Sequence, residues 1–140
     1  MKTVIILLLV FASALSRASV VSLPRGGQII VDEKEWTIQD TKALTGMSSL
    51  FFQHKKEKVL QGVVLDGTVR EKGECASGRS AICDRVVPMG EDLSYQIIGQ
   101  KFHGKDTYQN YVIAFTIPKE QEQKFLPILR KLKERMEFAK

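Results

Sequence analysis

The order in which strand-like and helix-like patterns follow one another constrains the fold of this chain more than any other feature. Strand-like segments fill most of residues 28 to 117, and a helical period follows them. Parallel sheets need helices between successive strands, and the sequence lacks that alternation. It therefore predicts an α+β fold, in which a mainly antiparallel β-sheet packs one face against a C-terminal amphipathic helix.

The clearest strands, residues 93–102 and 108–117, predict a hairpin closed by the turn 103–107. Successive side chains of a strand point to opposite faces of a sheet, and the two faces of the second strand differ in size. The larger side chains are Tyr111, Ile113, Phe115 and Ile117, and the smaller ones are Val112, Ala114 and Thr116.

Residues 48–54 and 59–65 predict a second pair of strands around a charged turn. Gly62 lies within the second of these strands and indicates a bulge or a close approach of a neighbouring segment. The pair Asp66-Gly67 then predicts a turn.

Shorter segments complete the predicted order of elements. Residues 28–31 and 35–39 predict a hairpin or a bent strand around the turn 32–34. Residues 40–44 predict one helical turn, and residues 85–87 predict a short strand.

A helix is expected from about residue 119 to residue 138. Apolar residues recur there at helical spacing and form one stripe. The stripe consists of Phe125, Ile128, Leu129, Leu132 and Met136. Pro127 falls on the opposite, solvent side, and its missing amide predicts a kink or a helix that restarts there. The polar side is basic, which leaves open a contact with anionic lipid, but interspersed glutamates favour a solvated face.

Residues 1–18 predict a cleaved secretory signal peptide. Lys2 precedes an apolar run over residues 4–12, which is shorter than the about 20 residues needed to span a bilayer. Small residues place the cleavage site after Ala14 or Ala18. We therefore expect a secreted or periplasmic protein with neither a lipid-anchor cysteine nor a transmembrane segment.

After removal of this peptide, residues 19–27 are expected to form a flexible N-terminal segment and residues 28–140 a single domain. The formal net charge falls from +5 to +3 when Lys2 and Arg17 are removed. A charge this small, without a run of Lys or Arg, argues against a nucleic-acid partner.

The two cysteines of the chain, Cys75 and Cys83, predict a disulfide in an oxidising compartment. The bridge would close a short loop with Arg79 near its tip. A closed loop loses less conformational entropy on binding than an open one. Together with the turn 103–107, it gives the candidate binding residues Arg79, Ser80, His103 and Lys105.

Catalytic and cofactor motifs are missing from the sequence. His54 and His103 do not stand at metal-ligand spacing, and we expect both to face solvent in turns. No Gly-x-Ser-x-Gly segment or phosphate-binding glycine loop occurs. We expect no metal, no cofactor and no catalytic centre. A small hydrolase remains an alternative, and it requires the two histidines to converge with a carboxylate.

These observations favour an exported binding or accessory protein whose partner is another protein and whose oligomeric state is open. A secreted protease inhibitor is the alternative, with Arg79 as the presented cation. The length of the cysteine loop resembles that of the reactive loop in Bowman-Birk-type protease inhibitors. Ser77 stands where that family places its specificity residue, and the loop contains no proline.

Overall fold

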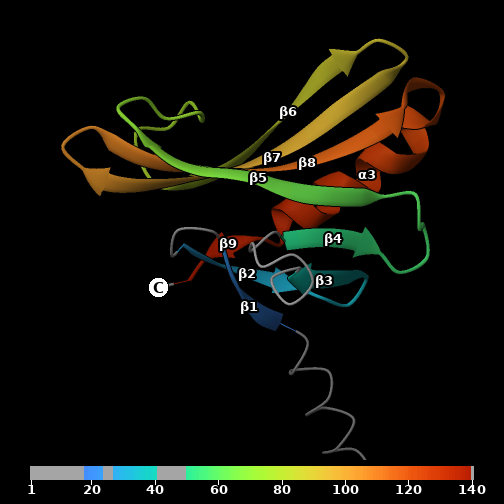
Figure 1. Cartoon of the computed structure of the whole chain (residues 1–140), viewed down its shortest axis with the longest axis horizontal. Coiled ribbons are helices and arrows are strands. Elements are labelled where there is room, and N and C mark those ends of the chain that lie inside the picture. The colour runs from blue at the N-terminus through green and yellow to red at the C-terminus, as the bar shows by residue number, and fades with distance from the viewer. Residues whose placement is uncertain (1–17, 24–26, 41–49, 140) are drawn as a thin grey trace, which may run out of the picture.

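The computed structural model describes residues 18–23, 27–40 and 50–139. Residues 1–17 of the predicted signal peptide and residues 41–44 of the predicted helical turn lie outside this part of the chain. The described residues form antiparallel sheets and one α-helix (Figure 1), which confirms the predicted α+β fold class. No helix within these ranges is long and apolar enough to cross a membrane.

The main sheet has six strands in the order β3-β4-β5-β8-β7-β6. The strands are β3 (Trp36–Asp40), β4 (Leu50–His54), β5 (Gln61–Arg70), β6 (Ala81–Met89), β7 (Asp92–Gly104) and β8 (Thr107–Pro118). All neighbouring strands are antiparallel. The two predicted strand pairs, β4 with β5 and β7 with β8, are confirmed.

A small sheet has the order β1-β2-β9, with β1 (Ala18–Ser22), β2 (Gln28–Asp32) and β9 (Glu137–Phe138). Two predictions are corrected here. Residues 18–22, most of which we expected in a flexible segment, pair with β2. The expected hairpin or bent strand over 28–31 and 35–39 is wrong, because β2 pairs with β1 and β9 in the small sheet while β3 pairs with β4 in the main sheet.

The predicted turn at Asp66-Gly67 is also wrong. β5 continues through it to Arg70, with an irregular register between Val64 and Asp66. The long neighbouring strand β8 offers backbone partners along this whole stretch, and these outweigh the local turn preference. Gly62 has the close approach that we predicted: an added Cβ would lie 2.5 Å from the ring of Phe115.

The core lies on one face of the main sheet, which we call the inner face. The large residues of β8 point there and are buried, and so do Tyr95 and Ile97 of β7. Helix α3 (Glu122–Glu134) follows a short 3₁₀ turn (Lys119–Gln121) and packs against β6, β7 and β8. It buries Phe125, Leu126, Leu129 and Leu132.

The C-terminal helix is shorter than predicted, because residues 137 and 138 form β9. Met136 is buried and Ile128 is partly buried, as the apolar stripe predicts. Pro127 is exposed inside the helix, so the helix is not restarted at this residue.

Candidate functional site

The segment between β5 and β6 folds back over the outer face of the main sheet, opposite the core. Cys75 and Cys83 form the predicted disulfide within it. The β7–β8 turn lies at the same end of the sheet (Figure 1). We call this end, formed by residues 71–80 and 103–107, the loop end.

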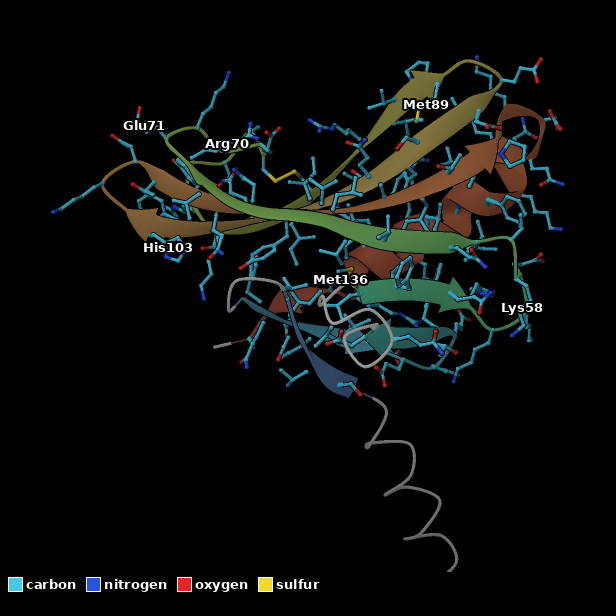
Figure 2. All side chains as sticks on the ribbon, viewed as in Figure 1. Lys58, Arg70, Glu71, Met89, His103 and Met136 are labelled. Carbon is cyan, nitrogen blue, oxygen red and sulfur yellow. A yellow bond between two sulfur atoms is a disulfide. The ribbon has the colours of Figure 1, made fainter. Side chains whose placement is uncertain are left out.

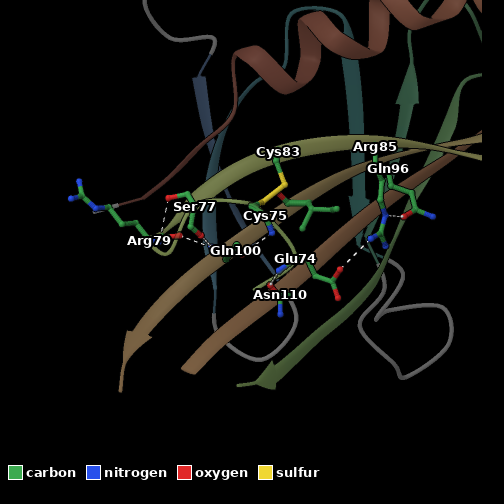
Figure 3. The surroundings of a disulfide bond; sticks show 10 residues. Glu74, Cys75, Ser77, Arg79, Cys83, Arg85, Gln96, Gln100 and Asn110 are labelled. Atoms are coloured by element: carbon green, nitrogen blue, oxygen red, sulfur yellow. Dashed lines mark hydrogen bonds and ion pairs between the residues drawn. A yellow bond between two sulfur atoms is a disulfide. The ribbon is translucent and has the colours of Figure 1, made fainter. Parts of the chain in front are cut away.

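Gln100 of β7 fixes the backbone of the cysteine loop (Figure 3). Its Oε1 accepts a hydrogen bond from the amide of Cys75 at 2.8 Å, and its Nε2 donates to the carbonyls of Ser77 and Arg79, both at 2.7 Å. The Gln100 side chain is fully buried. A buried amide with these partners stabilises one loop conformation, because each unpaired group would cost about 1–3 kcal/mol.

Asn110, which pairs with Gln100 in the β7–β8 register, supports the start of the same loop. Its Nδ2 donates to the carbonyl of Lys72, and its Oδ1 accepts from the amide of Glu74. Gly73 lies so close to Gln100 that a Cβ there would collide with the amide side chain. The loop is therefore held by buried amides as well as by the disulfide, whose loop length corresponds to about 2.5 kcal/mol of stabilisation in the chain-entropy model.

The two predicted loop residues, Arg79 and Ser80, are both exposed. Ser80 Oγ accepts a hydrogen bond from the amide of Phe102 at 2.9 Å, which connects the loop to β7. The Arg79 side chain points away from the loop (Figure 3). Among the described residues, no carboxylate lies within ion-pair distance of its guanidinium.

The predicted residues of the β7–β8 turn, His103 and Lys105, lie at the same loop end. Both are exposed, and His103 Nε2 contacts Gln109 Oε1 at 3.1 Å. The turn residues Lys105 and Asp106 have φ angles of 53° and 56°. This left-handed backbone is typical of a two-residue hairpin turn. Lys105 has no ion-pair partner in the described ranges.

Two aromatic residues, Phe102 of β7 and Tyr108 of β8, flank the β7–β8 turn. The rings of Phe102 and Tyr108 are 5.3 Å apart, and Phe102 is 39% exposed. Tyr108 also lies near Gly78 of the cysteine loop. The loop end thus combines cations with a partly exposed aromatic surface on a fixed backbone. This combination suits recognition of another protein.

His54 lies at the opposite end of the main sheet, as the last residue of β4 before the connection to β5. Our expectation that it faces solvent is wrong, because it is 6% exposed and packs edge-on against Trp36. Its Nδ1 accepts hydrogen bonds from the amides of Lys56 and Glu57. Burial lowers the pKa of His54, against the opposing effect of the nearby Glu35 carboxylate. His54 therefore has a structural role in its turn.

The two histidines do not converge with a carboxylate, as the hydrolase alternative requires. His54 is the last residue of β4, which ends away from the loop end (Figure 1), whereas Figure 2 shows His103 at the loop end. Within the described ranges, no three His, Cys, Asp or Glu side chains are placed to hold a metal ion.

The sequence identified the exposed residues of the loop end and missed the buried ones. Gln100 and Asn110 occupy outer-face positions of strands that we had predicted, where a polar residue normally indicates solvent exposure. Their directly opposed placement in the predicted hairpin was the available signal. No family model, curated protein or solved structure matches this chain.

Proposed function

We propose that this protein is exported and acts by binding an acidic surface of another protein through its loop end, without a catalytic centre of its own. The signal-peptide pattern of residues 1–18 and the disulfide both support the export. One observation carries the binding proposal: Arg79 and Lys105 are exposed at the loop end without carboxylate partners among the described residues.

The fixed backbone matters because binding by a flexible loop loses conformational entropy. Gln100 and the disulfide already order the cysteine loop in the folded protein, so the backbone of Arg79 loses little further conformational entropy on binding. Phe102 and Tyr108 add apolar contact area next to the charges. A carboxylate-bearing partner with an apolar centre complements this surface.

The geometry argues against the protease-inhibitor alternative. An inhibitory loop must offer the carbonyl of its specificity residue to the oxyanion hole of the protease. The carbonyl of Arg79 instead accepts a 2.7 Å hydrogen bond from the buried Gln100 side chain. An assay of the purified protein against an arginine-specific protease tests this point, and inhibition that is lost in Arg79→Ala would restore the alternative.

The binding proposal is tested by affinity capture from the exported fraction of the source organism, with the disulfide intact. The test variant is Arg79→Ala combined with Lys105→Ala, and the matched control is Lys56→Ala combined with Lys58→Ala at the opposite end of the sheet. We expect the wild-type and control proteins to retain the same partner, and the test variant to bind it about tenfold more weakly.

Added salt should weaken the wild-type complex, because the contact depends on charge. Equal recovery of the partner by the test variant and the wild type would contradict a role for the loop end. Thermal unfolding of both variants should match the wild type, which separates a lost contact from a lost fold.

A further inference from the structure

Strand β6 is an edge of the main sheet and pairs on one side with β7. It is nine residues long. The β6–β7 turn, Gly90-Glu91, has two residues between the paired Met89 and Asp92, and such a turn is flanked by a hydrogen-bonded pair. By alternation, the amides of Ile82, Asp84 and Val86 then point to the open side of the strand.

The charged side chains of β6 do not block pairing of its open edge with another strand. Edge strands normally carry charges that discourage pairing with another chain. Here Asp84 Oδ2 accepts a 2.6 Å hydrogen bond from the buried Tyr95 hydroxyl. Arg85 is bound by Glu74 at 3.1 Å and Gln96 at 2.7 Å. Both side chains are directed to their own molecule, so the open backbone is left accessible.

Apolar side chains are exposed along the same strand. Val86 is 37% exposed, Val87 36% and Met89 53%. Figure 2 shows Met89 near the end of β6, away from the small sheet. The outward amides of β6 have no backbone partner among the described residues. Such an edge, with exposed apolar side chains, fits an added β-strand.

We propose that β6 pairs antiparallel with β6 of a second copy of this chain, across a two-fold axis at Arg85. In this register, the amide of Ile82 bonds the carbonyl of Pro88, that of Asp84 bonds Val86, and that of Val86 bonds Asp84. The paired strands would extend the main sheet continuously through both molecules. Closed two-fold symmetry is the commonest arrangement of soluble homo-oligomers.

A second copy of this chain fits the open edge of β6 because the two ends of the strand complement each other. A groove of about 570 Å³ lies beside the start of β6. It is lined by Ser80, Ala81, Ile82, Lys133, Glu134, Met136, Glu137 and Phe138. The register sets Pro88 of the second copy opposite Ile82, on the inner side where the apolar side chains of Met136 and Phe138 line the groove.

The proposal is tested by sedimentation equilibrium of the purified, disulfide-intact protein over a wide concentration range. We expect a reversible monomer–dimer equilibrium. Val86→Asp places a second carboxylate directly opposite Asp84 of the other copy and should raise the dimer dissociation constant about tenfold or more. The matched control is Val59→Asp, which adds the same charge at a valine that is 57% exposed in the β4–β5 connection, and it should leave the equilibrium unchanged.

Val86→Pro separates backbone pairing from charge. It removes an open-side amide that its own sheet does not use, so it should weaken the dimer while the thermal unfolding of the monomer stays close to wild type. A protein that is monomeric at every concentration overturns the proposal. A dimer that both Val86 variants leave intact also overturns it, because its interface would lie elsewhere.

Discussion

The two ends of the main sheet perform the same structural task with different chemistry. At the loop end, the buried amide of Gln100 holds the backbone of the cysteine loop. At the other end, the buried imidazole of His54 holds the amides of Lys56 and Glu57 in the β4–β5 connection, which we call the turn end. An amide does not titrate, whereas an imidazole does. The comparison predicts that the Gln100 hydrogen bonds hold the cysteine loop independently of pH, whereas the turn end loosens in acid.

Replacing Gln100 should have the largest effect, because one side chain satisfies three backbone groups of the loop. Gln100→Met keeps the length of the side chain and removes its hydrogen bonds. We expect the free energy of unfolding to fall by about 3 kcal/mol. The amide of Cys75 should also exchange its hydrogen faster, measured by hydrogen–deuterium exchange at two or more pH values.

The control for this variant is Gln53→Met, because Gln53 bonds the carbonyl of Lys58 at the surface. It should cost about 0.5 kcal/mol or less. Comparable losses in the two variants would mean that the loop does not depend on the buried amide of Gln100.

The second prediction concerns pH and the turn end. Burial lowers the pKa of His54 below 6.5, its ordinary value, so the unfolded chain takes up a proton at a higher pH than the folded chain. The contribution of neutral His54 to stability is therefore complete above pH 6.5 and decreases as the pH falls toward the folded-state pKa. Thermal unfolding between pH 7.5 and 5 should show this loss, with faster exchange of the Lys56 and Glu57 amides.

His54→Gln tests the assignment, since its side-chain oxygen can accept hydrogen bonds without titrating. The variant should lose less stability than the wild type over the same pH interval. The Glu35 carboxylate lies 4.0 Å from His54 Nε2 and raises the pKa of His54, which opposes the effect of burial. An identical pH profile in the two proteins would assign the acid sensitivity to other groups.

The smallest expected effect lies in the β7–β8 turn of the loop end. Asp106 has a φ of 56°, a left-handed conformation that is strained for an L-residue and unstrained for glycine. Asp106→Gly should raise the free energy of unfolding by about 0.5 kcal/mol while it retains Lys105. Gly104→Ala is the converse variant, because Gly104 has a φ of 83° and open space around it. It should be destabilising by about 1 kcal/mol in chemical denaturation, and a neutral result would contradict the strain.

Local periodicity was sufficient to predict β7, β8 and their buried face, because neighbouring strands of a hairpin interact over short sequence distances. It was insufficient for the small sheet. Ile29 pairs with Phe138, which lies far from it in the chain, and no local sequence pattern predicts this pairing. The turn predicted at Asp66-Gly67 was wrong for a related reason. Backbone pairing with the long strand β8 extends β5 through these two residues.

The residues of the candidate site also divide into those that local sequence predicts and those that depend on tertiary contacts. Turn chemistry and the cysteine spacing identified Arg79 and Lys105, which depend on local geometry. The support from Gln100 and the burial of His54 depend on which segments cover these side chains, and that information is tertiary.

The pairing of β2 with β9 also sets an order of events during synthesis. β1 and β2 leave the ribosome well before residues 137 and 138, so one edge of β2 stays open in the growing chain. A two-stranded ribbon is marginally stable on its own in water. The small sheet can therefore be completed only after the rest of the domain has been synthesised. A chain whose synthesis stops earlier would expose Ile29 and Val31 to other proteins.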